Sequence, residues 1–237
     1  MKALILAAGK GSRLGNMTLD RPKAMVNVSG RPLIDYVLDF LAHREVKEIG
    51  IVGGYKFDTL EHHIKISANA PMRVFYNPHY NEGSIRTVMT ACDFLDDDFL
   101  LMNADHIYPK RMLPSLLAQR HGITAMCDYD RNLTGDDMKI KKGKDGYLIK
   151  IRKDLADYDG GYIGMTYIPK TKLGAYKEAM ADSYKIYGAS SNVEAILGHM
   201  ASSGHQISIA DLGGQGWLEV DTPEDLKGAE ARITKGL

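Results

Sequence analysis

The residues near the N-terminus combine glycines with cations in a way that suits the binding of an anion. The stretch GKGSRLGNMTLDRPKAM begins at Gly9, directly after the apolar run KALILA, and contains Lys10, Arg13 and Lys23. Glycine lets the backbone approach a ligand closely, exposed N–H groups form a nest for an anion, and fixed cations stabilise phosphate charge. This segment therefore predicts a binding site for a phosphorylated ligand.

Two common phosphate-binding motifs do not describe this segment. A P-loop requires Gly-Lys-Ser/Thr at its end, whereas Lys10 is followed here by Gly11. A dinucleotide fingerprint requires a third glycine where Leu14 stands and a helix that begins at once, whereas the residues up to Met25 are typical of a long loop. An ordinary glycine turn is the alternative, but it does not explain three cations after one strand.

Two carboxylates further along the chain are candidates for holding a divalent ion. Asp105, in LLMNADHIY, follows an apolar strand pattern, and Asp221, in GWLEVDTPEDL, stands at a strand-to-helix turn. Mg²⁺ favours one or two carboxylates together with phosphate oxygens. The alternatives are a plain turn residue at position 105 and a capping role at position 221.

The first half of the chain alternates strand and helix patterns. The apolar runs KALILA, EIGIVGG, RVFYN and DFLLMNAD are separated by the helical patterns PLIDYVLDFLAHR, DTLEHHIKI and SIRTVMTACDFL. This order predicts an α/β fold with a Rossmann-like, mostly parallel sheet between helices, in which ligands bind beyond the carboxyl ends of the strands. We therefore expect the crevice at residues 9–13, 53–55, 77 and 103–106.

The second half of the chain has a different pattern. ITAMCDYD, MKIKK, GYLIKIR and YIGMTYI predict a small antiparallel extension, followed by helices around TKLGAYKEAMA and SSNVEAILGHMA and by short strands in ISIAD and GWLEV. A closing helix is predicted with Thr222 as N-cap, Pro223 at its first position and Asp225 completing a capping box. We expect a single domain over residues 1–237.

Composition limits the class of partner. The formal net charge is zero, so the basic excess typical of a nucleic-acid-binding protein is absent. The first apolar run is too short for a signal peptide, and no stretch approaches the roughly 18 apolar residues of a membrane span. Cys92 and Cys127 are expected to be buried small residues. These features favour a soluble cytoplasmic protein with small-molecule partners, no nucleic acid and no membrane insertion, and they leave a homo-oligomer open.

The segment LAAGKGSRL, with RPKAM after it, resembles the signature of nucleotidyltransferases that activate sugar or alcohol phosphates with a nucleoside triphosphate. The resemblance implies that Arg13 and Lys23 are catalytic and neutralise the triphosphate, and that Asp105 and Asp221 hold Mg²⁺ or Mn²⁺. His106 is not expected to act as a base, because the acceptor phosphate is already ionised. The nucleotide-binding residues that it implies are Leu6, Ala7, Ala8, Gly9, Lys10, Gly11, Ser12, Arg13, Lys23, Gly53, Gly54, Tyr55, Gly83, Ser84, Ala104 and Asp105.

The same resemblance divides the domain by ligand. Residues 1–110 would bind the nucleotide, and residues 111–237 would bind the acceptor and supply the second metal ligand. Lys153 stands where sugar-activating relatives carry a lysine on the acceptor phosphate, and Asp136 and Lys139 are expected to line the same cavity. A solvated, charged turn is the alternative for all three residues.

The choice of nucleotide rests on two segments. The base is expected near residues 53–55 and near NEGSIRT, where Gly83 and Ser84 open a helix with free N–H groups. The Gln and Gly-rich segments of thymidylyl and uridylyl enzymes are not evident there, and YNPHYNEGSIRTVMTA, ADHIY and WLEVDTPEDL are more similar to cytidylyltransferases acting on inositol 1-phosphate, phosphocholine or related phosphonates. This similarity implies transfer of CMP from CTP to a phosphorylated small alcohol, giving a CDP-alcohol and pyrophosphate.

Two other functions remain open at this point. One is a sugar-1-phosphate uridylyl-, thymidylyl- or guanylyltransferase that makes a nucleotide sugar from another nucleoside triphosphate. The other is a non-catalytic module that senses a nucleotide. The presence of Arg13, Lys23, Asp105 and Asp221 together favours an enzyme over such a module.

Overall fold

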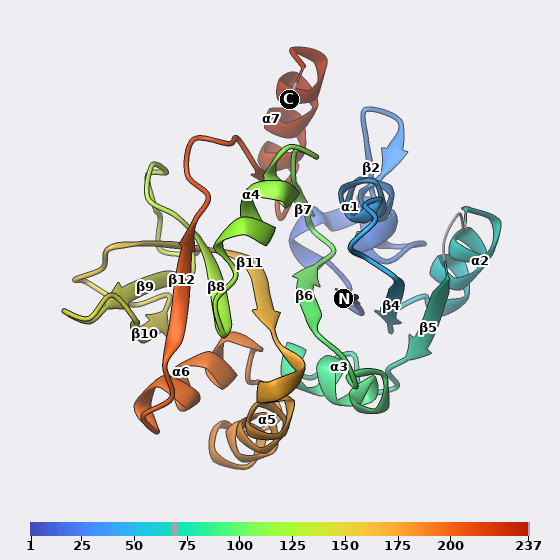
Figure 1. The fold of residues 1–237 in the computed structure, drawn as a ribbon. Coiled ribbons are helices and arrows are strands. Elements are labelled where there is room, and N and C mark those ends of the chain that lie inside the picture. Colours follow the sequence, from blue (N-terminus) through green and yellow to red (C-terminus); the bar gives the residue numbers. More distant parts are fainter. Residues whose placement is uncertain (68–70, 237) are drawn as a thin grey trace.

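The computed structural model describes residues 1–67 and 71–236, and within them one nine-stranded sheet lies between two groups of helices (Figure 1). The path of neighbouring strands runs β10-β9-β11-β6-β1-β4-β5, and β8 and β12 continue the sheet from the other edge of β11. The strands of this sheet are β1 (Lys2–Ala7), β4 (Glu48–Gly53), β5 (Met72–Tyr76), β6 (Phe99–Asn103), β8 (Ile123–Asp128), β9 (Lys139–Lys142), β10 (Leu148–Arg152), β11 (Gly160–Ile168) and β12 (Ile207–Asp211).

Most of the sheet is parallel, which confirms the predicted fold class. β1 pairs parallel with β4 and β6, and β4 pairs parallel with β5. β11 pairs antiparallel with β6, β8 and β9, as expected for the second half. β9 also pairs antiparallel with β10, so all four segments of the expected antiparallel extension pair in this way, and β8 in addition pairs parallel with β12.

Helices cover both faces of the sheet, because the central strands are apolar on both sides. Along β1, Ala3, Ile5 and Ala7 pack into one buried cluster with α1, α2 and α4, while Leu4 and Leu6 pack into another with α3, α5 and α6. Figure 1 shows α3, α5 and α6 along one side of the sheet and α1 and α4 along the other. The helices are α1 (Leu33–Leu41), α2 (Phe57–Ser67), α3 (Ser84–Thr90), α4 (Met112–Gln119), α5 (Leu173–Tyr187), α6 (Glu194–Ser202) and α7 (Pro223–Thr234).

A third buried cluster joins the two ends of the chain. Leu14 and Val26 of the glycine-rich loop pack with Ile107, Val220 and Leu226. We expected an irregular loop up to Met25, but this segment contains the 3₁₀ helices η1 (Ser12–Thr18) and η2 (Lys23–Met25). It is followed by the hairpin formed by β2 (Asn27–Val28) and β3 (Arg31–Pro32). The cluster brings this loop next to the pair formed by β7 (His106–Ile107) and β13 (Leu218–Glu219).

The closing helix α7 has the predicted cap. The Asp225 amide donates to Thr222 Oγ1 at 3.2 Å, and the Thr222 amide donates to Asp225 Oδ2 at 2.8 Å.

The two cysteines are unpaired; Cys127 is buried as expected, whereas Cys92, in η3 (Cys92–Phe94), is only half-buried. η4 (Lys170–Lys172) leads into α5.

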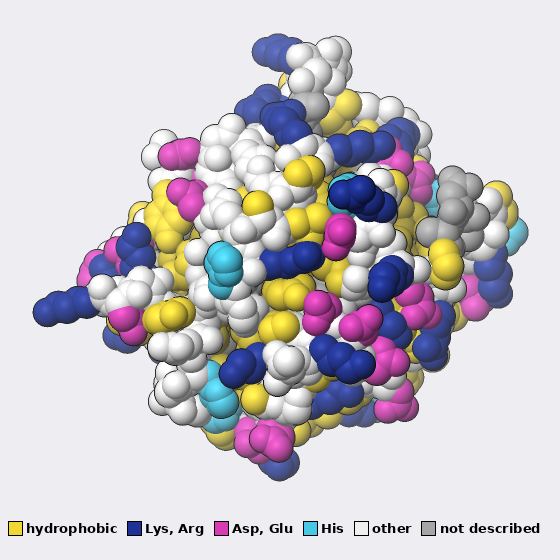
Figure 2. All heavy atoms as spheres, in the orientation of Figure 1, with side chains coloured by type: hydrophobic (Ala, Val, Ile, Leu, Met, Phe, Trp, Pro, Cys, Tyr) yellow, Lys and Arg dark blue, Asp and Glu magenta, His cyan; other side chains and the backbone are white. Residues whose placement is uncertain are grey.

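The surface mixes charges of both signs. On the face drawn in Figure 2, Lys and Arg side chains lie among Asp and Glu side chains, in keeping with the formal net charge of zero. In the part of the chain that the structure describes, no helix is both long enough and apolar enough to cross a membrane.

Candidate active site

A cavity of about 420 Å³ opens beyond the carboxyl ends of β1 and β6, where the strand order predicted a ligand crevice. Predicted site residues that line it are Leu6, Ala8, Gly9, Gly11, Ser12, Arg13, Lys23, Gly83, Ser84, Asp105, Asp136, Lys153 and Asp221. Predicted site residues outside its lining are Ala7, Lys10, Gly53, Gly54, Tyr55, Ala104 and Lys139. The cavity therefore collects residues from both halves of the chain.

The glycine-rich loop folds back on itself at Gly11. Gly11 has φ 70°, a left-handed conformation that favours glycine, and a Cβ at this position would lie 2.8 Å from Lys23 Cβ. Thr18 Oγ1 donates to the Gly11 carbonyl at 3.1 Å, and the Lys23 amide donates to the Gly9 carbonyl at 3.3 Å. These bonds place the Lys23 side chain at the end of β1.

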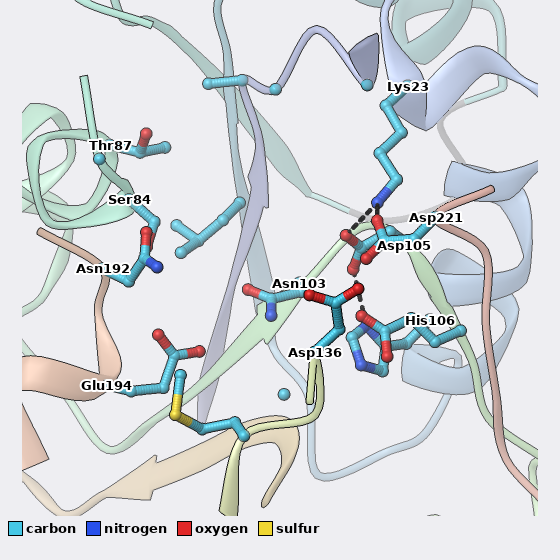
Figure 3. Close-up of a pocket in the computed structure, with 18 of the residues that line it drawn as sticks. Lys23, Ser84, Thr87, Asn103, Asp105, His106, Asp136, Asn192, Glu194 and Asp221 are labelled. Atoms are coloured by element: carbon cyan, nitrogen blue, oxygen red, sulfur yellow. Dashed lines mark hydrogen bonds and ion pairs between the residues drawn. The ribbon is translucent and has the colours of Figure 1, made fainter. Parts of the chain in front are cut away.

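Four charged residues, Arg13, Lys23, Asp105 and Asp221, meet at one end of the cavity and are called the charge cluster below. Figure 3 shows Lys23 pointing toward Asp105 and Asp221. Lys23 Nζ lies 2.5 Å from Asp105 Oδ2 and also pairs with Asp221 Oδ1. Arg13 Nη2 lies 2.5 Å from Asp221 Oδ2, and its Nη1 lies 3.5 Å from Asp136 Oδ2. Residues far apart in the sequence thus form one alternating network of cations and carboxylates.

The network sets the protonation of its members. Burial opposes the charge of Lys23, but Asp105 and Asp221 raise its pKa above the usual value. Burial likewise opposes the charge of Asp105, yet Lys23 and His106 hold the pKa of this carboxyl well below its usual range. Lys23 and Asp105 are therefore both charged at neutral pH.

His106 holds Asp105 in place from the other side. Its Nδ1 lies 2.6 Å from Asp105 Oδ1, and its ring stacks between Tyr108 and Trp217 at centroid distances of 5.6 and 5.3 Å. Burial opposes its charge, whereas Glu219 and Asp105 raise its pKa. These contacts fix the orientation of the Asp105 carboxylate, as an outer-shell partner does for a metal ligand.

The donor set at the charge cluster fits a hard divalent cation. Oxygens of Asp105 and Asp221 both contact the Lys23 ammonium, so the two carboxylates are close enough to share one cation. Carboxylate oxygens are the ligands that Mg²⁺ prefers. A second grouping, Asp105 with His106 and Glu219, has ligand atoms within 4.8 Å of one another, but its imidazole is less suited to Mg²⁺.

On the nucleotide side, one expectation was partly wrong. Two of the N–H groups expected to be free at the start of α3 are occupied, because the Gly83 amide donates to the Ala189 carbonyl at 2.7 Å and the Ile85 amide donates to the Ser191 carbonyl at 3.3 Å. A side chain at Gly83 would collide with the backbone of Ser191. The segment before α6 thus covers this end of the helix, a contact that no local sequence pattern indicated.

Residues 53–55 lie beside the glycine-rich loop. The Tyr55 hydroxyl donates to the Leu19 carbonyl at 2.9 Å, and Lys10 Nζ lies 5.5 Å from the centre of the Tyr55 ring. Tyr55 therefore supports the loop from outside the cavity lining, and Lys10 lies next to it rather than in the lining.

On the acceptor side, the predicted residues separate. Lys153 and Asp136 line the cavity, whereas Lys139 is buried and its Nζ donates to the Thr134 and Lys153 carbonyls at 2.6 and 2.7 Å. Lys139 thus holds together the two turns that carry the other residues.

Several residues of the cavity wall were not predicted. They are Tyr80, Met138, Gly164, Asn192, Glu194 and Glu219. Asn103 and His106, which also line the cavity, belong to the expected crevice, and Glu82 and Thr87 belong to the segment NEGSIRT, near which the base was expected. Asn192 and Glu194 lie in a stretch that had only the pattern of a helix start, and Glu219 alternates with core residues in a strand pattern. Local sequence patterns do not distinguish these residues from ordinary surface residues, because only the order of the strands in the folded sheet brings them to the cavity.

The fold and the charged cavity define a nucleotidyltransferase domain. The family model of the MobA-like NTP transferase domain matches residues 3–140, and the chain belongs to this family.

Individual relatives extend the likeness beyond residue 140. A bifunctional IPC transferase and DIPP synthase from Rubrobacter xylanophilus is 28% identical over 98% of this chain and 51% of its own length. A CTP:phosphoglutamine cytidylyltransferase from Campylobacter jejuni is 29% identical over 70% of this chain and 72% of its own length. The chain spans about half the length of the first of these relatives.

A solved structure supports the fold independently. The inositol-1-phosphate CTP transferase from T. maritima superposes with a TM-score of 0.83 at 19% identity, covering 100% of this chain and 97% of that one. At this identity the likeness concerns the fold, including the antiparallel region around β11.

Proposed function

We propose that this protein catalyses the Mg²⁺-dependent transfer of CMP from CTP to the phosphate of a small phosphorylated alcohol. The observation that carries the proposal is the convergence of Arg13, Lys23, Asp105 and Asp221 at one end of the cavity. A triphosphate and a divalent cation require the same two kinds of group, cations for the phosphates and carboxylates for the metal.

The reaction is a displacement at phosphorus. An oxygen of the acceptor phosphate attacks the α-phosphorus of CTP, a new P–O bond forms, and the bond to the β-phosphate oxygen breaks to release pyrophosphate. Bound Mg²⁺ would screen the repulsion between the two anionic reactants. Arg13 and Lys23 neutralise the triphosphate, the Gly9–Gly11 backbone approaches it, and Lys153 contacts the acceptor phosphate. The acceptor has no proton to lose, so no general base is needed.

The identity of the substrates is supported by the relatives. The CTP:phosphoglutamine cytidylyltransferase aligns with 70% of this chain, and the inositol-1-phosphate CTP transferase aligns with 100% of it. Both names include CTP and a small phosphorylated acceptor. The cavity volume of about 420 Å³ suits small-molecule ligands rather than a polymer. Both observations favour a CDP-alcohol as product.

A substrate panel tests the proposal. The purified chain is incubated with CTP, UTP, dTTP, ATP or GTP and with myo-inositol 1-phosphate, phosphocholine, phosphoglutamine or glucose 1-phosphate, and pyrophosphate release and product mass are measured. We expect CTP and one of the phosphorylated alcohols to give a CDP-alcohol, and excess chelator to stop the reaction. A preference for UTP or dTTP with glucose 1-phosphate would assign the protein to nucleotide-sugar synthesis instead.

A further inference from the structure

Glu194 is a charged residue of the cavity that the reaction above does not use. It lies at the first position of α6 and lines the cavity, next to Asn192 in the preceding turn. Figure 3 shows both residues across the cavity from Lys23 and Asp221. Apart from its own backbone amide, no donor among residues 1–67 and 71–236 hydrogen-bonds to the Glu194 carboxylate.

The backbone that carries Glu194 is firmly held. The Val193 amide donates to Ser84 Oγ at 2.8 Å, and the Gly83 amide donates to the Ala189 carbonyl at 2.7 Å. These bonds join the turn before α6 to the start of α3, so the backbone at Asn192 and Glu194 has a fixed position on the cavity wall. A site held in this way is preorganised for a ligand.

The Glu194 side chain is half-buried, and its carboxylate oxygens can accept hydrogen bonds from a ligand in the cavity. Burial raises the pKa of Glu194, against the opposing effects of its own backbone amide and of the Lys153 charge. Lys153 lines the same cavity but forms no ion pair with Glu194 within the described residues. If Lys153 contacts the acceptor phosphate, the rest of the acceptor extends toward the carboxylate.

The wall around Glu194 distinguishes between classes of acceptor. A quaternary ammonium has no hydrogen to donate and requires aromatic faces. Among the described residues of the cavity lining, the only aromatic side chains besides His106 are Tyr80 and Tyr162, and the Tyr162 hydroxyl already bonds to Thr166 at 2.8 Å. Hydroxyl groups, by contrast, can donate to Glu194 and can both donate to and accept from the Asn192 amide.

We infer that Glu194 and Asn192 form a subsite that binds the hydroxyl groups of a neutral polyol phosphate. This inference rests on the proposed function and specifies its acceptor. It assigns recognition of the phosphate to Lys153 and recognition of the carbon skeleton to the turn before α6.

The test compares Glu194→Ala with the matched control Glu178→Ala, which removes an exposed glutamate from α5. We expect Glu194→Ala to raise the KM for myo-inositol 1-phosphate about tenfold or more, since one hydrogen bond to a charged group contributes that much affinity. The KM for CTP should change less than about twofold in either variant, and circular dichroism should show that both variants fold.

A deoxy analogue separates recognition from a structural role. The wild type should bind an inositol phosphate that lacks the contacted hydroxyl about tenfold more weakly, whereas Glu194→Ala should bind the two compounds equally. An equal loss in both proteins for every deoxy analogue, or an unchanged KM in Glu194→Ala, would overturn the subsite. A best substrate of phosphocholine would overturn it as well.

Binding without turnover distinguishes the two proposals. Calorimetry with myo-inositol 1-phosphate measures the subsite directly in the wild-type, Glu194→Ala and Asn192→Ala proteins. Weaker binding in both variants but no CMP transfer by the wild type would refute the proposed function and leave the subsite standing. CMP transfer by the wild type, with unchanged binding of myo-inositol 1-phosphate in both variants, would support the proposed function and refute the subsite.

Discussion

The two ends of the cavity treat charge in opposite ways. At one end, the charge cluster pairs Lys23 with Asp105 and Asp221, and it pairs Arg13 with Asp221. At the other end, Lys153 and Glu194 line the wall, and the described residues include no ion-pair partner for either. The charges at the first end are paired within the protein, whereas Lys153 and Glu194 at the second end are open to a ligand in the cavity.

This difference follows from what each end has to bind. A triphosphate and its metal carry large charges of both signs, so cations and carboxylates must be held close together before the ligands arrive. An acceptor that varies between relatives is distinguished by a few hydrogen bonds, each of which is lost if the protein satisfies it internally. Under the proposed function, the paired end would serve the chemistry and the unpaired end the choice of substrate.

The largest effect is expected from breaking the paired end at Lys23. Lys23→Ala removes a cation that pairs with both Asp105 and Asp221, so turnover should fall about 100-fold. The melting temperature should also fall, because two largely covered carboxylates lose a charged hydrogen-bond donor. Initial rates and thermal unfolding measure both effects, with the exposed Lys227→Ala in α7 as control. Near-normal turnover would show that the loop does not bind the triphosphate.

Arg13 provides an internal comparison within the same cluster. Its side chain is 48% exposed, against 13% for Lys23. Arg13→Ala should therefore lower turnover more than tenfold while changing the free energy of unfolding by no more than about 1 kcal/mol.

The next effect concerns the metal. Asp105→Asn and Asp221→Asn keep the side-chain shape but remove a hard anionic ligand, so each should lose most of its activity and require more Mg²⁺ or Mn²⁺. Turnover against metal concentration measures this, and Asp182→Asn on the exposed side of α5 is the control. Wild-type turnover that survives excess chelator would contradict a metal-assisted reaction.

A smaller and more selective effect is expected at the unpaired end. Lys153→Ala should raise the KM for the acceptor about tenfold and leave the KM for CTP nearly unchanged, because the two anions bind at different ends of the cavity. The free energy of unfolding should not change, since Lys153 is exposed and none of the described residues forms an ion pair with it. Equal changes in both constants would show that the two ends do not act separately.

The two ends also differ in how well the sequence predicts them. The charge cluster was predicted because Arg13 and Lys23 belong to one contiguous segment, and Asp105 and Asp221 follow recognisable strand patterns. Similarly, the capping box at Thr222 and the mostly parallel sheet depend on local patterns. Their roles in catalysis and metal binding stay predictions.

The unpaired end was harder to predict because it depends on packing between distant segments. Glu194 reaches the cavity only because the turn before α6 docks on α3 through Ser84 and Gly83, a contact between residues about 110 positions apart. The same docking occupies the helix N-terminus that was expected to be free. No local spacing encodes such a contact, so residue type alone gave Glu194 no role.

The smallest effect on the acceptor KM is expected from Lys139→Met, which tests whether Lys139 supports the acceptor end or binds the acceptor itself. The sequence suggested direct contact with the acceptor, whereas in the structure its ammonium bonds to the Thr134 and Lys153 carbonyls. Lys139→Met should therefore lower the melting temperature, because the two carbonyls lose the charged donor that joins their turns. It should raise the acceptor KM less than Lys153→Ala does, since it acts only by loosening the turn that carries Lys153. In the double variant the two KM effects should not add, because both act through the position of one ammonium group. The opposite result would be an acceptor KM raised as strongly as in Lys153→Ala, an unchanged melting temperature, and additive KM effects in the double variant. That result would show that Lys139 binds the acceptor itself.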